Sequence, residues 1–308
     1  MKHLISIADV TREELEDILE LAEKLKEERY RGRVTDYLKN KSLAMIFELP
    51  STRTRISFEV AMTDLGGHAL YLNWNDLQLG RGEPIKDTAR VLSRYVHAVV
   101  MRVRRHSTIL EFAKYSTVPV INGLSDLEHP CQIIADLLTI KEYKGDLKNV
   151  RLAWVGDGNN VCNSLILASA LTGMKMIVCT PRGYEPNREI VEKAIRLGAN
   201  LEFESDPEKA VEDADVIYTD VWVSMGQERE RKKRLKAFAS YQVTQNLVDF
   251  AKANVVVMHC LPAHRGEEIT EEVLEGEHSI VFDQAENRLH AQKAILLKLI
   301  GDKVGRLE

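Results

Sequence analysis

Short apolar stretches alternate with amphipathic ones along almost the whole chain. Residues 11–28 place apolar side chains on one helical face, and Thr11 and Glu14 have the spacing of a capping box at its start. Apolar runs such as SLAMIF (residues 42–47) then alternate with helical segments such as residues 129–143. Apolar strands separated by helices are typical of parallel sheets built from βαβ units.

The same pattern predicts the individual elements. Strands are expected at residues 42–48, 69–73, 98–103, 118–122, 150–157, 175–181, 215–222, 254–262 and 279–284. Helices are expected at residues 54–67, 85–96, 108–116, 129–143, 164–173, 188–199, 246–252 and 287–300. The charged run ERERKKRLK (residues 228–236) is interpreted as a solvated helix face.

The pattern restarts after Gly145, which closes a long helix, so a domain boundary is expected there. The length of 308 residues suits two domains. We therefore expect an α/β protein with two doubly wound parallel-sheet domains, residues 1–145 and 146–286. A C-terminal helix, residues 287–308, is expected to pack back toward the first domain. The active site is expected in the cleft between the two domains.

Composition narrows the class of protein. The net charge of −5, with both signs intermixed, gives no basic face for nucleic acid. No apolar run approaches the roughly 18 residues of a membrane span, and the chain does not start like a signal peptide, so we expect a cytoplasmic protein. The scattered cysteines are interpreted as reduced thiols, neither a disulfide framework nor a zinc site: Cys131, Cys162, Cys179 and Cys260.

The stretch after the first strand is rich in hydrogen-bond donors. Ser51, Thr52, Arg53 and Thr54 stand where a helix begins, and ligands of parallel sheets bind at the carboxyl ends of strands. Helix N–H groups, hydroxyls and a guanidinium together make an anion site suited to phosphate. A helix cap followed by solvated arginines explains the same residues about equally well.

Other strand ends also carry polar side chains. Arg102 follows one strand, and HPCQ (residues 129–132) opens a helix from which His129 and Gln132 can point into the crevice. Taken alone, each of these residues is interpreted as an ordinary polar residue of the surface. Several such strand ends converging on one crevice favour a binding site.

The stretch VGDGNNV resembles a dinucleotide loop only in part. Gly156 and Gly158 fit, but Val161 holds the third glycine position, and the next strand does not end in an acidic residue. A nicotinamide dehydrogenase is therefore disfavoured. The alternative use of the loop is to present Asn159 and Asn160 to a polar substrate.

Two residues of the second half invite a chemical role. Asp220 ends a strand and is suited to hold an ammonium group. Cys260 could be a nucleophile with His259 or His264, but a small, partly buried residue is the favoured interpretation.

Four motifs resemble those of the aspartate/ornithine carbamoyltransferase family, over essentially the whole chain. STRTR (residues 51–55) and HPCQ are similar to motifs of carbamoyl phosphate users in general. Asp220 with Ser224-Met225-Gly226, and HCLP (residues 259–262), resemble the ornithine branch. The resemblance implies transfer of a carbamoyl group from carbamoyl phosphate to the side-chain amine of ornithine, without metal or cofactor. The implied products are citrulline and phosphate, and the implied pathway is arginine biosynthesis.

The resemblance also implies roles for individual residues. The implied carbamoyl phosphate contacts are Ser51, Thr52, Arg53, Thr54, Gln78, Arg102, His129, Gln132, Cys260, Leu261 and Arg288. The implied catalytic residues are Arg102, His129, Thr54 and Cys260. The implied ornithine contacts are Asn160, Asp220, Ser224 and Met225.

The same family implies an oligomer and leaves alternatives open. The loop with Gln78 and Lys86 would reach a neighbouring subunit, which implies a homotrimer or a multiple of trimers. Leu49 stands where ornithine enzymes commonly have lysine. This departure is expected to change activity little, but it weakens the assignment of ornithine as the second substrate. Putrescine and acetylornithine remain alternative amines, whereas Asp220 argues against aspartate. A non-catalytic binding protein would not need His129, Arg102 and Gln132 together.

Overall fold

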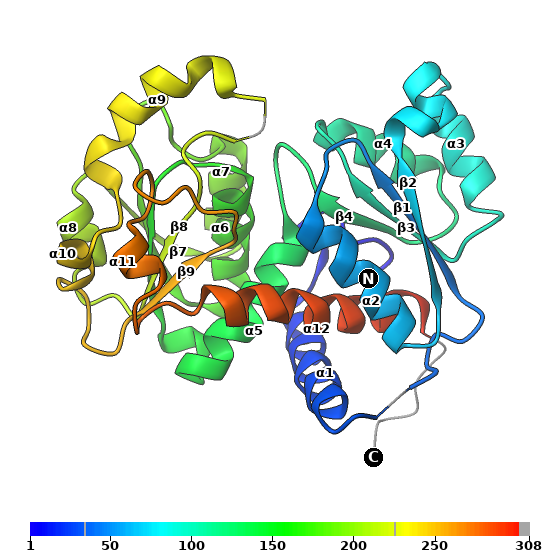
Figure 1. Ribbon diagram of the computed structural model, residues 1–308, viewed down its shortest axis with the longest axis horizontal. Coiled ribbons are helices and arrows are strands. Elements are labelled where there is room, and N and C mark those ends of the chain that lie inside the picture. Colours follow the sequence, from blue (N-terminus) through cyan, green and yellow to red (C-terminus); the bar gives the residue numbers. More distant parts are fainter. Residues whose placement is uncertain (34, 225, 302–308) are drawn as a thin grey trace. The chain divides into compact units, whose positions relative to one another are not determined.

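The described chain packs as two compact α/β units (Figure 1). Of the described residues, the first unit contains those up to Leu138 and those from Glu286 onward, and the second contains those from Thr139 to Ala285. The structure is a computed structural model, and it describes residues 1–33, 35–224 and 226–301.

The chain passes between the two units inside helices. These helices are α5 (Pro130–Lys144) and α12 (Val281–Ile300), and the change of unit follows Leu138 in one and Ala285 in the other. The domain bounds expected from the sequence, at residues 145 and 286, stay predictions.

The first unit is built on a parallel sheet with the strand order β2-β1-β3-β4. Its strands are β1 (Ser42–Phe47), β2 (His68–Asn73), β3 (Ala98–Arg102) and β4 (Val120–Leu124). Its other helices are α1 (Arg12–Tyr30), α2 (Thr52–Asp64), α3 (Ile85–Leu92) and α4 (His106–Tyr115). From β1 the chain adds β2 on one side, then β3 and β4 on the other. The switch point, where such sheets bind ligands, therefore lies between the carboxyl ends of β1 and β3.

The second unit repeats this plan with the strand order β7-β6-β5-β8-β9, all parallel. Its strands are β5 (Arg151–Val155), β6 (Lys175–Cys179), β7 (Asn200–Glu204), β8 (Val216–Thr219) and β9 (Val256–His259). Its helices are α6 (Asn160–Thr172), α7 (Arg188–Arg196), α8 (Pro207–Val211), α9 (Arg231–Phe238), α10 (Gln245–Val248) and α11 (Glu271–Leu274). Its switch point lies between β5 and β8.

Local signals in the sequence explain where several helices begin and end. Thr11 caps α1 and forms the predicted capping box with Glu14. Ser51 caps α2, and Asn159 caps α6. Gly173 ends α6 in the left-handed conformation, with φ of 79°, which glycine adopts at no steric cost.

The strands at both switch points are buried on both faces. Every residue of β3 and β8 is buried, and so is every residue of β1 and β5 after the first. Burial on both faces is expected for parallel strands covered by helices, and it explains their continuous apolar sequences. The predicted pair of parallel-sheet α/β domains is confirmed.

One expected strand is wrong, and one strand and two short helices were missed. Residues 279–284 do not form a strand, because α12 already begins at Val281 and Ser279 makes only an isolated bridge to Val257. A short apolar run cannot distinguish a strand from the start of a buried helix. The edge strand β7 escaped prediction because it is largely exposed and its sequence NLEFE is half polar. The helices α8 and α11 escaped prediction because they have only five and four residues, too few to show a helical period.

Among the described residues, no helix is both long and apolar enough to span a bilayer.

Candidate active site

The first turn of α2 follows directly on the carboxyl end of β1. Ser51 has an extended backbone, and its Oγ accepts a hydrogen bond from the Thr54 N–H at 3.1 Å. This bond begins the helix with its N–H groups and positive dipole end at the switch point. The predicted phosphate-binding stretch is therefore a helix cap, and a helix cap at this place is also suited to an anion.

Two arginines from distant segments converge on Thr54. Arg102 is the last residue of β3, and its Nη1 lies 3.5 Å from Thr54 Oγ1, at the limit for a hydrogen bond. Arg288 of α12 donates from Nη2 to the same oxygen at 3.1 Å. A hydroxyl has two acceptor positions and one proton. With both acceptor positions facing guanidinium groups, the Thr54 hydroxyl is oriented to donate its proton to a further acceptor, such as a phosphate or carbonyl oxygen.

Arg288 also binds the side chain of Gln132. Its Nη1 donates to Gln132 Oε1 at 2.6 Å, and Gln132 Nε2 donates to Asp136 Oδ1 at 2.8 Å. All three side chains are buried. The hydrogen-bonded chain Asp136–Gln132–Arg288–Thr54 thus links α5, α12 and α2 within the first unit.

His129 immediately precedes α5 and is buried beside positive charge. Its backbone oxygen accepts from the N–H groups of Gln132 and Ile133, which places it at the mouth of the helix. Burial, and then the charges of Arg288, Arg102 and Arg53, hold the pKa of His129 well below its usual 6.5. The imidazole is therefore neutral at physiological pH, and it can donate a hydrogen bond without carrying a charge.

We call Arg53, Arg102 and Arg288 the arginine cluster. The charges of all three lower the pKa of His129. Three guanidinium groups around one buried imidazole suit a ligand with more than one negative charge. Arg55 of the same motif has another role: it stacks over the Tyr71 ring at 3.8 Å and pairs with Glu59 at 3.2 Å.

Asp220 follows β8 at the switch point of the second unit. Its Oδ2 accepts from Asn159 Nδ2 at 2.7 Å, and its Oδ1 accepts from Cys260 Sγ at 3.1 Å. The carboxylate is buried apart from a small exposed fraction. A carboxylate has about four acceptor positions, so Asp220 can still receive an ammonium group.

The neighbouring loop places Asn159, rather than Asn160, against Asp220. Asn159 Oδ1 also accepts from the N–H groups of Val161 and Cys162, so this side chain both caps α6 and binds Asp220. Asn160, the predicted substrate contact, is the first residue of α6 and is partly exposed. The sequence predicted that the loop presents both Asn159 and Asn160 to a polar substrate. The contact between Asn159 and Asp220 could not be predicted, because their separation along the chain carries no signal.

Gly158 in the same loop is required by close packing. A Cβ atom there would lie 2.2 Å from the backbone nitrogen of Pro186. The incomplete glycine pattern therefore has a packing cause and needs no dinucleotide.

The HCLP motif is held by a buried acid that the sequence did not reveal. His259 Nδ1 accepts from the Leu261 N–H at 2.8 Å, so the imidazole proton is on Nε2, which lies 3.0 Å from Glu268 Oε1. The same Glu268 oxygen accepts from the His264 N–H at 2.6 Å. These bonds orient Leu261, whose φ is 58°, and the neighbouring Cys260.

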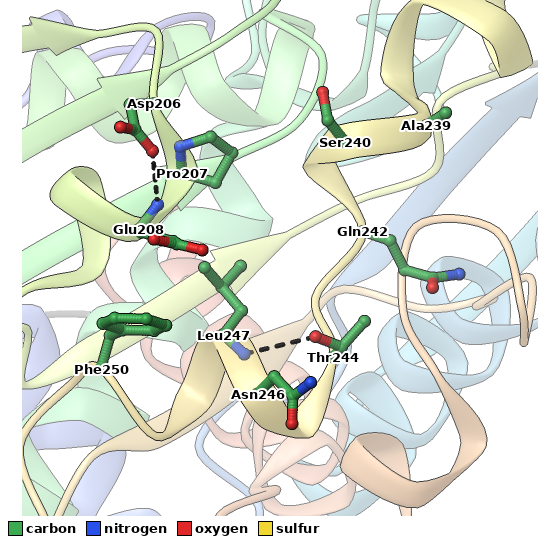
Figure 2. A pocket seen from close by; sticks show the side chains of 10 residues that line it. All are labelled: Asp206, Pro207, Glu208, Ala239, Ser240, Gln242, Thr244, Asn246, Leu247 and Phe250. Atoms are coloured by element: carbon green, nitrogen blue, oxygen red, sulfur yellow. Dashed lines mark hydrogen bonds between the residues drawn. The ribbon is translucent and has the colours of Figure 1, made fainter.

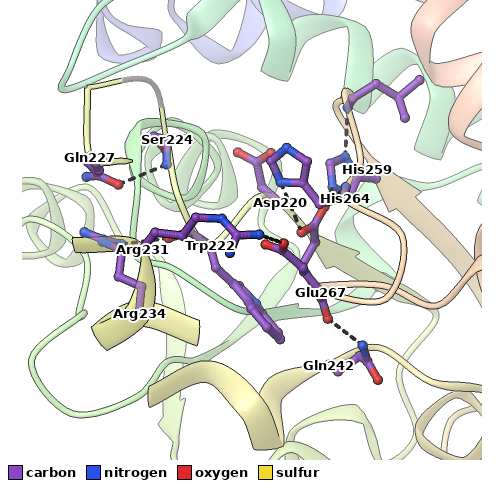
Figure 3. A network of polar contacts seen from close by, with 12 residues as sticks. Asp220, Trp222, Ser224, Gln227, Arg231, Arg234, Gln242, His259, His264 and Glu267 are labelled. Atoms are coloured by element: carbon purple, nitrogen blue, oxygen red, sulfur yellow. Dashed lines mark hydrogen bonds and ion pairs between the residues drawn. The ribbon is translucent and has the colours of Figure 1, made fainter. Parts of the chain in front are cut away.

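The loop after β8 is anchored at Trp222 (Figure 3). Arg234 of α9 donates to the Trp222 carbonyl at 2.9 Å and pairs with Asp157 at 3.1 Å. Burial raises the pKa of Asp157 to about 6, although Arg234 acts against this rise. Further along the loop, the Ser224 N–H donates to Gln227 Oε1 at 3.0 Å. The predicted substrate contact Met225 lies outside the described residues.

Other predicted residues stand apart from these groups. Thr52 is exposed in the first turn of α2. Gln78 is exposed on a short 3-10 helix (Gln78–Arg81), and Lys86 is exposed at the start of α3. Among the described residues, no hydrogen bond or ion pair joins Gln78 to the arginine cluster. Leu49, the departure from the family pattern, is buried.

Asp220, His259 and Cys260 bring donor atoms within 4.8 Å of one another, a spacing that could hold a metal ion. Both ring nitrogens of His259 and the Cys260 sulfur already make hydrogen bonds with protein groups. Those bonds account for the grouping.

The second unit also has a surface pocket of about 360 Å³ that none of the predicted site residues lines (Figure 2). Asp206 and Thr244 on its wall cap α8 and α10 with their side-chain oxygens. These polar atoms therefore have structural roles in helix capping.

Comparison with known proteins assigns both halves of the chain to one family. The model of the aspartate/ornithine carbamoyltransferase carbamoyl-P binding domain matches residues 2–142, and that of the Asp/Orn binding domain matches residues 148–299. The protein is therefore a carbamoyltransferase. The chain belongs to the aspartate/ornithine carbamoyltransferase family.

Similar proteins carry the name of one branch of this family. An ornithine carbamoyltransferase of Archaeoglobus fulgidus is 78% identical over 301 residues, which cover 98% of each chain. One of Methanosarcina mazei is 58% identical, over 97% of this chain and 99% of the relative. Among solved structures, the ornithine carbamoyltransferase of Pyrococcus furiosus is 54% identical, with a TM-score of 0.94 over 99% of this chain and 98% of that one.

Proposed function

We propose that this protein transfers the carbamoyl group of carbamoyl phosphate to the side-chain amine of L-ornithine, which yields L-citrulline and phosphate. The observation that carries the proposal is the convergence of Arg102 and Arg288 on the Thr54 hydroxyl, beside the capped start of α2. This arrangement suits a ligand with both a phosphate and a carbonyl oxygen. The names of the similar proteins support ornithine as the acceptor.

The first unit is proposed to bind carbamoyl phosphate. Its phosphate would be held by Ser51, Thr52, Arg53, Thr54 and Arg102. The carbonyl oxygen would face donors from Thr54, Arg102 and the neutral His129. When the amine attacks, negative charge develops on this oxygen, and fixed donors in a buried site stabilise that charge at little reorganisation cost.

The second unit is proposed to bind ornithine. Asp220 is held in place by Asn159 and Cys260, and it would bind an ammonium group of the substrate. Asn160, Ser224 and Met225 are proposed as further contacts. Cys260 would help to position the reacting amine, since its thiol already donates to Asp220.

The chemistry needs no covalent enzyme intermediate. The amine lone pair forms a bond to the carbonyl carbon, the bond from that carbon to the phosphate oxygen breaks, and the amine loses its proton. Holding the two reactants in attack geometry supplies roughly 7–11 kcal/mol of the barrier reduction. An ornithine ammonium must first be deprotonated, because it has no lone pair.

We also propose the setting of this reaction. A cytoplasmic step of arginine biosynthesis and a homotrimer, or a multiple of trimers, are proposed. The exposed positions of Gln78 and Lys86 leave their loop open to a neighbouring subunit. Light scattering of the purified protein tests the oligomer, because a monomer in solution would contradict it.

The decisive experiment is citrulline formation by the purified protein from carbamoyl phosphate and ornithine. Putrescine, acetylornithine and aspartate are assayed in parallel, with Arg53→Ala as the test variant. Arg31→Ala, an exposed arginine at the end of α1, is the matched control. We expect turnover with ornithine alone, lost in Arg53→Ala and retained in Arg31→Ala. Turnover with another amine would overturn the acceptor, and absence of any transfer would overturn the reaction.

A further inference from the structure

We propose that Asp136 is the positioning residue that makes the site selective for a carbamoyl group. In this view Asp136 holds the Gln132 amide so that its carbonyl oxygen accepts an N–H of the carbamoyl amino group. Acyl phosphates that lack this amino group would then bind more weakly. The inference rests on the proposed function, and it adds a residue that would not itself touch the substrate.

The orientation of the Gln132 amide follows from its two partners. Asp136 Oδ1 lies 2.8 Å from Nε2, and Arg288 Nη1 lies 2.6 Å from Oε1. A guanidinium can only donate, so Arg288 needs the oxygen of the Gln132 amide, and the carboxyl oxygen of Asp136 accepts from the NH2 group on the other side. Both partners therefore require the same orientation, with the NH2 group toward Asp136 and the oxygen toward Arg288.

Burial makes this orientation costly to lose. The exposed fractions of Asp136, Gln132 and Arg288 are 0%, 1% and 2%. Water does not compete for these groups, so a flipped amide would leave buried polar atoms facing like partners. Gln132 and Asp136 are four residues apart on α5, which places both side chains on one face of the helix.

The oriented oxygen keeps capacity for a ligand. An amide oxygen has two acceptor positions, and Arg288 Nη1 needs only one of them. The second terminal nitrogen of Arg288, Nη2, binds Thr54 Oγ1, which also faces Arg102. The amide oxygen of Gln132 is therefore joined, through one guanidinium, to the groups proposed to bind the carbonyl and phosphate oxygens.

Acetyl phosphate is the matched probe, because it has a methyl group where carbamoyl phosphate has an amino group. Its phosphate and carbonyl oxygen can use the same donors, but it offers no N–H to Gln132. A buried acceptor left without its donor lowers affinity for such an analogue. The ratio of the two dissociation constants therefore reports the Gln132 interaction separately from the rest of the site.

The test measures binding of both phosphates by calorimetry, without an amine substrate. In Asp136→Ala, we expect carbamoyl phosphate to bind about 2- to 10-fold more weakly with acetyl phosphate unchanged, as for one lost hydrogen bond. In Asp136→Asn, which keeps an acceptor oxygen, the ratio should stay within about twofold of the unmodified protein. Asp17→Ala, at an exposed carboxylate of α1, is the control.

Other outcomes would overturn the inference. Equal weakening of both ligands in Asp136→Ala would assign Asp136 a purely structural role. If Asp136→Ala does not fold, Asp136→Asn decides alone, since a collapsed ratio there would exclude the acceptor role. In a Gln132→Ala background, replacement of Asp136 should leave the ratio unchanged. Because no ornithine is present, failure of the proposed acceptor would appear separately, as binding of carbamoyl phosphate without citrulline formation.

Discussion

Arg288 Nη2 lies 3.1 Å from Thr54 Oγ1, although 234 residues separate the two in the chain. The contact exists because α12 packs within the first unit. There Lys293 pairs with Asp64 of α2 at 2.5 Å, and Asn287 accepts from Lys26 of α1 at 2.9 Å. The last helix of the chain thus supplies a guanidinium to the carboxyl end of a sheet formed near its beginning.

Replacement of Arg288 by methionine should weaken the binding of carbamoyl phosphate. The change removes a guanidinium group from the proposed phosphate and carbonyl site, where it also holds Thr54 and Gln132. One charge-assisted bond to the ligand is worth about 1.5–3 kcal/mol, so the affinity should fall by about 10- to 150-fold. Calorimetry measures this, with Lys298→Met on the same helix as control. Unchanged affinity in Arg288→Met would exclude Arg288 from the site.

Replacement of Asp220 by asparagine should act on ornithine alone. The amide lacks the charge that would bind an ammonium group, and it presents one acceptor where the carboxylate presents two oxygens. We expect kcat/KM for ornithine to fall by about 10- to 100-fold. The dissociation constant of carbamoyl phosphate should change less than about twofold, since Asp220 belongs to the other unit.

Steady-state kinetics with both substrates checks this prediction. Asp249→Asn, which changes an exposed carboxylate of the same unit, is the control and should behave like the unmodified protein. A parallel loss of carbamoyl phosphate binding in Asp220→Asn would indicate general damage instead of a lost ornithine contact.

The rate should rise with pH through neutrality because of the substrate, with no contribution from His129. An alkyl amine like that of lysine has a pKa near 10.4, so below this value each rise of one pH unit gives about ten times more neutral amine. Burial and the arginine cluster hold the pKa of His129 well below its usual 6.5, so titration of this imidazole does not cause the rise in rate through neutrality. We expect log kcat/KM for ornithine to increase with a slope near one between about pH 6 and 9.

The His129→Asn variant separates the two explanations. Its rate should be lower, because a donor to the carbonyl oxygen is changed, but its slope against pH should be the same. A flat profile in the unmodified protein, or a slope that disappears in the variant, would contradict the prediction.

Stability should fall in mild acid because of His290. Burial, with a smaller contribution from Lys293 and Lys26, lowers the pKa of His290 to about 4, although Glu286 acts in the opposite direction. The unfolded chain, with an ordinary pKa near 6.5, then binds more protons between these values. The contribution of the neutral imidazole to the free energy of unfolding is therefore fully present above about pH 7, and it is lost as the pH falls toward 4.

The loss amounts to on the order of 3 kcal/mol between pH 7 and 4. Denaturant unfolding at several pH values measures it in the unmodified protein and in His290→Gln, whose side chain does not titrate. We expect a smaller decrease in the variant over this range. Parallel curves for the two proteins would show that His290 does not control the acid sensitivity.

The sequence by itself determined most of the elements and the start of the anion site. Apolar runs and helix caps act between neighbours in the chain, so Thr11 with Glu14 and Ser51 with Thr54 adopt the expected local bonds. Where the apolar pattern was short or half polar, as in residues 279–284 and β7, the prediction failed.

Only the tertiary structure decided which side chains meet. Asn159 rather than Asn160 faces Asp220, Glu268 holds His259, and Arg288 holds Gln132. The partners of these bonds lie on different strands, loops or turns, or depend on which face of a helix is buried. Their distances follow from the order of strands in each sheet and from the packing of buried helices. These are properties of the whole fold, which residue spacing along the chain does not encode locally.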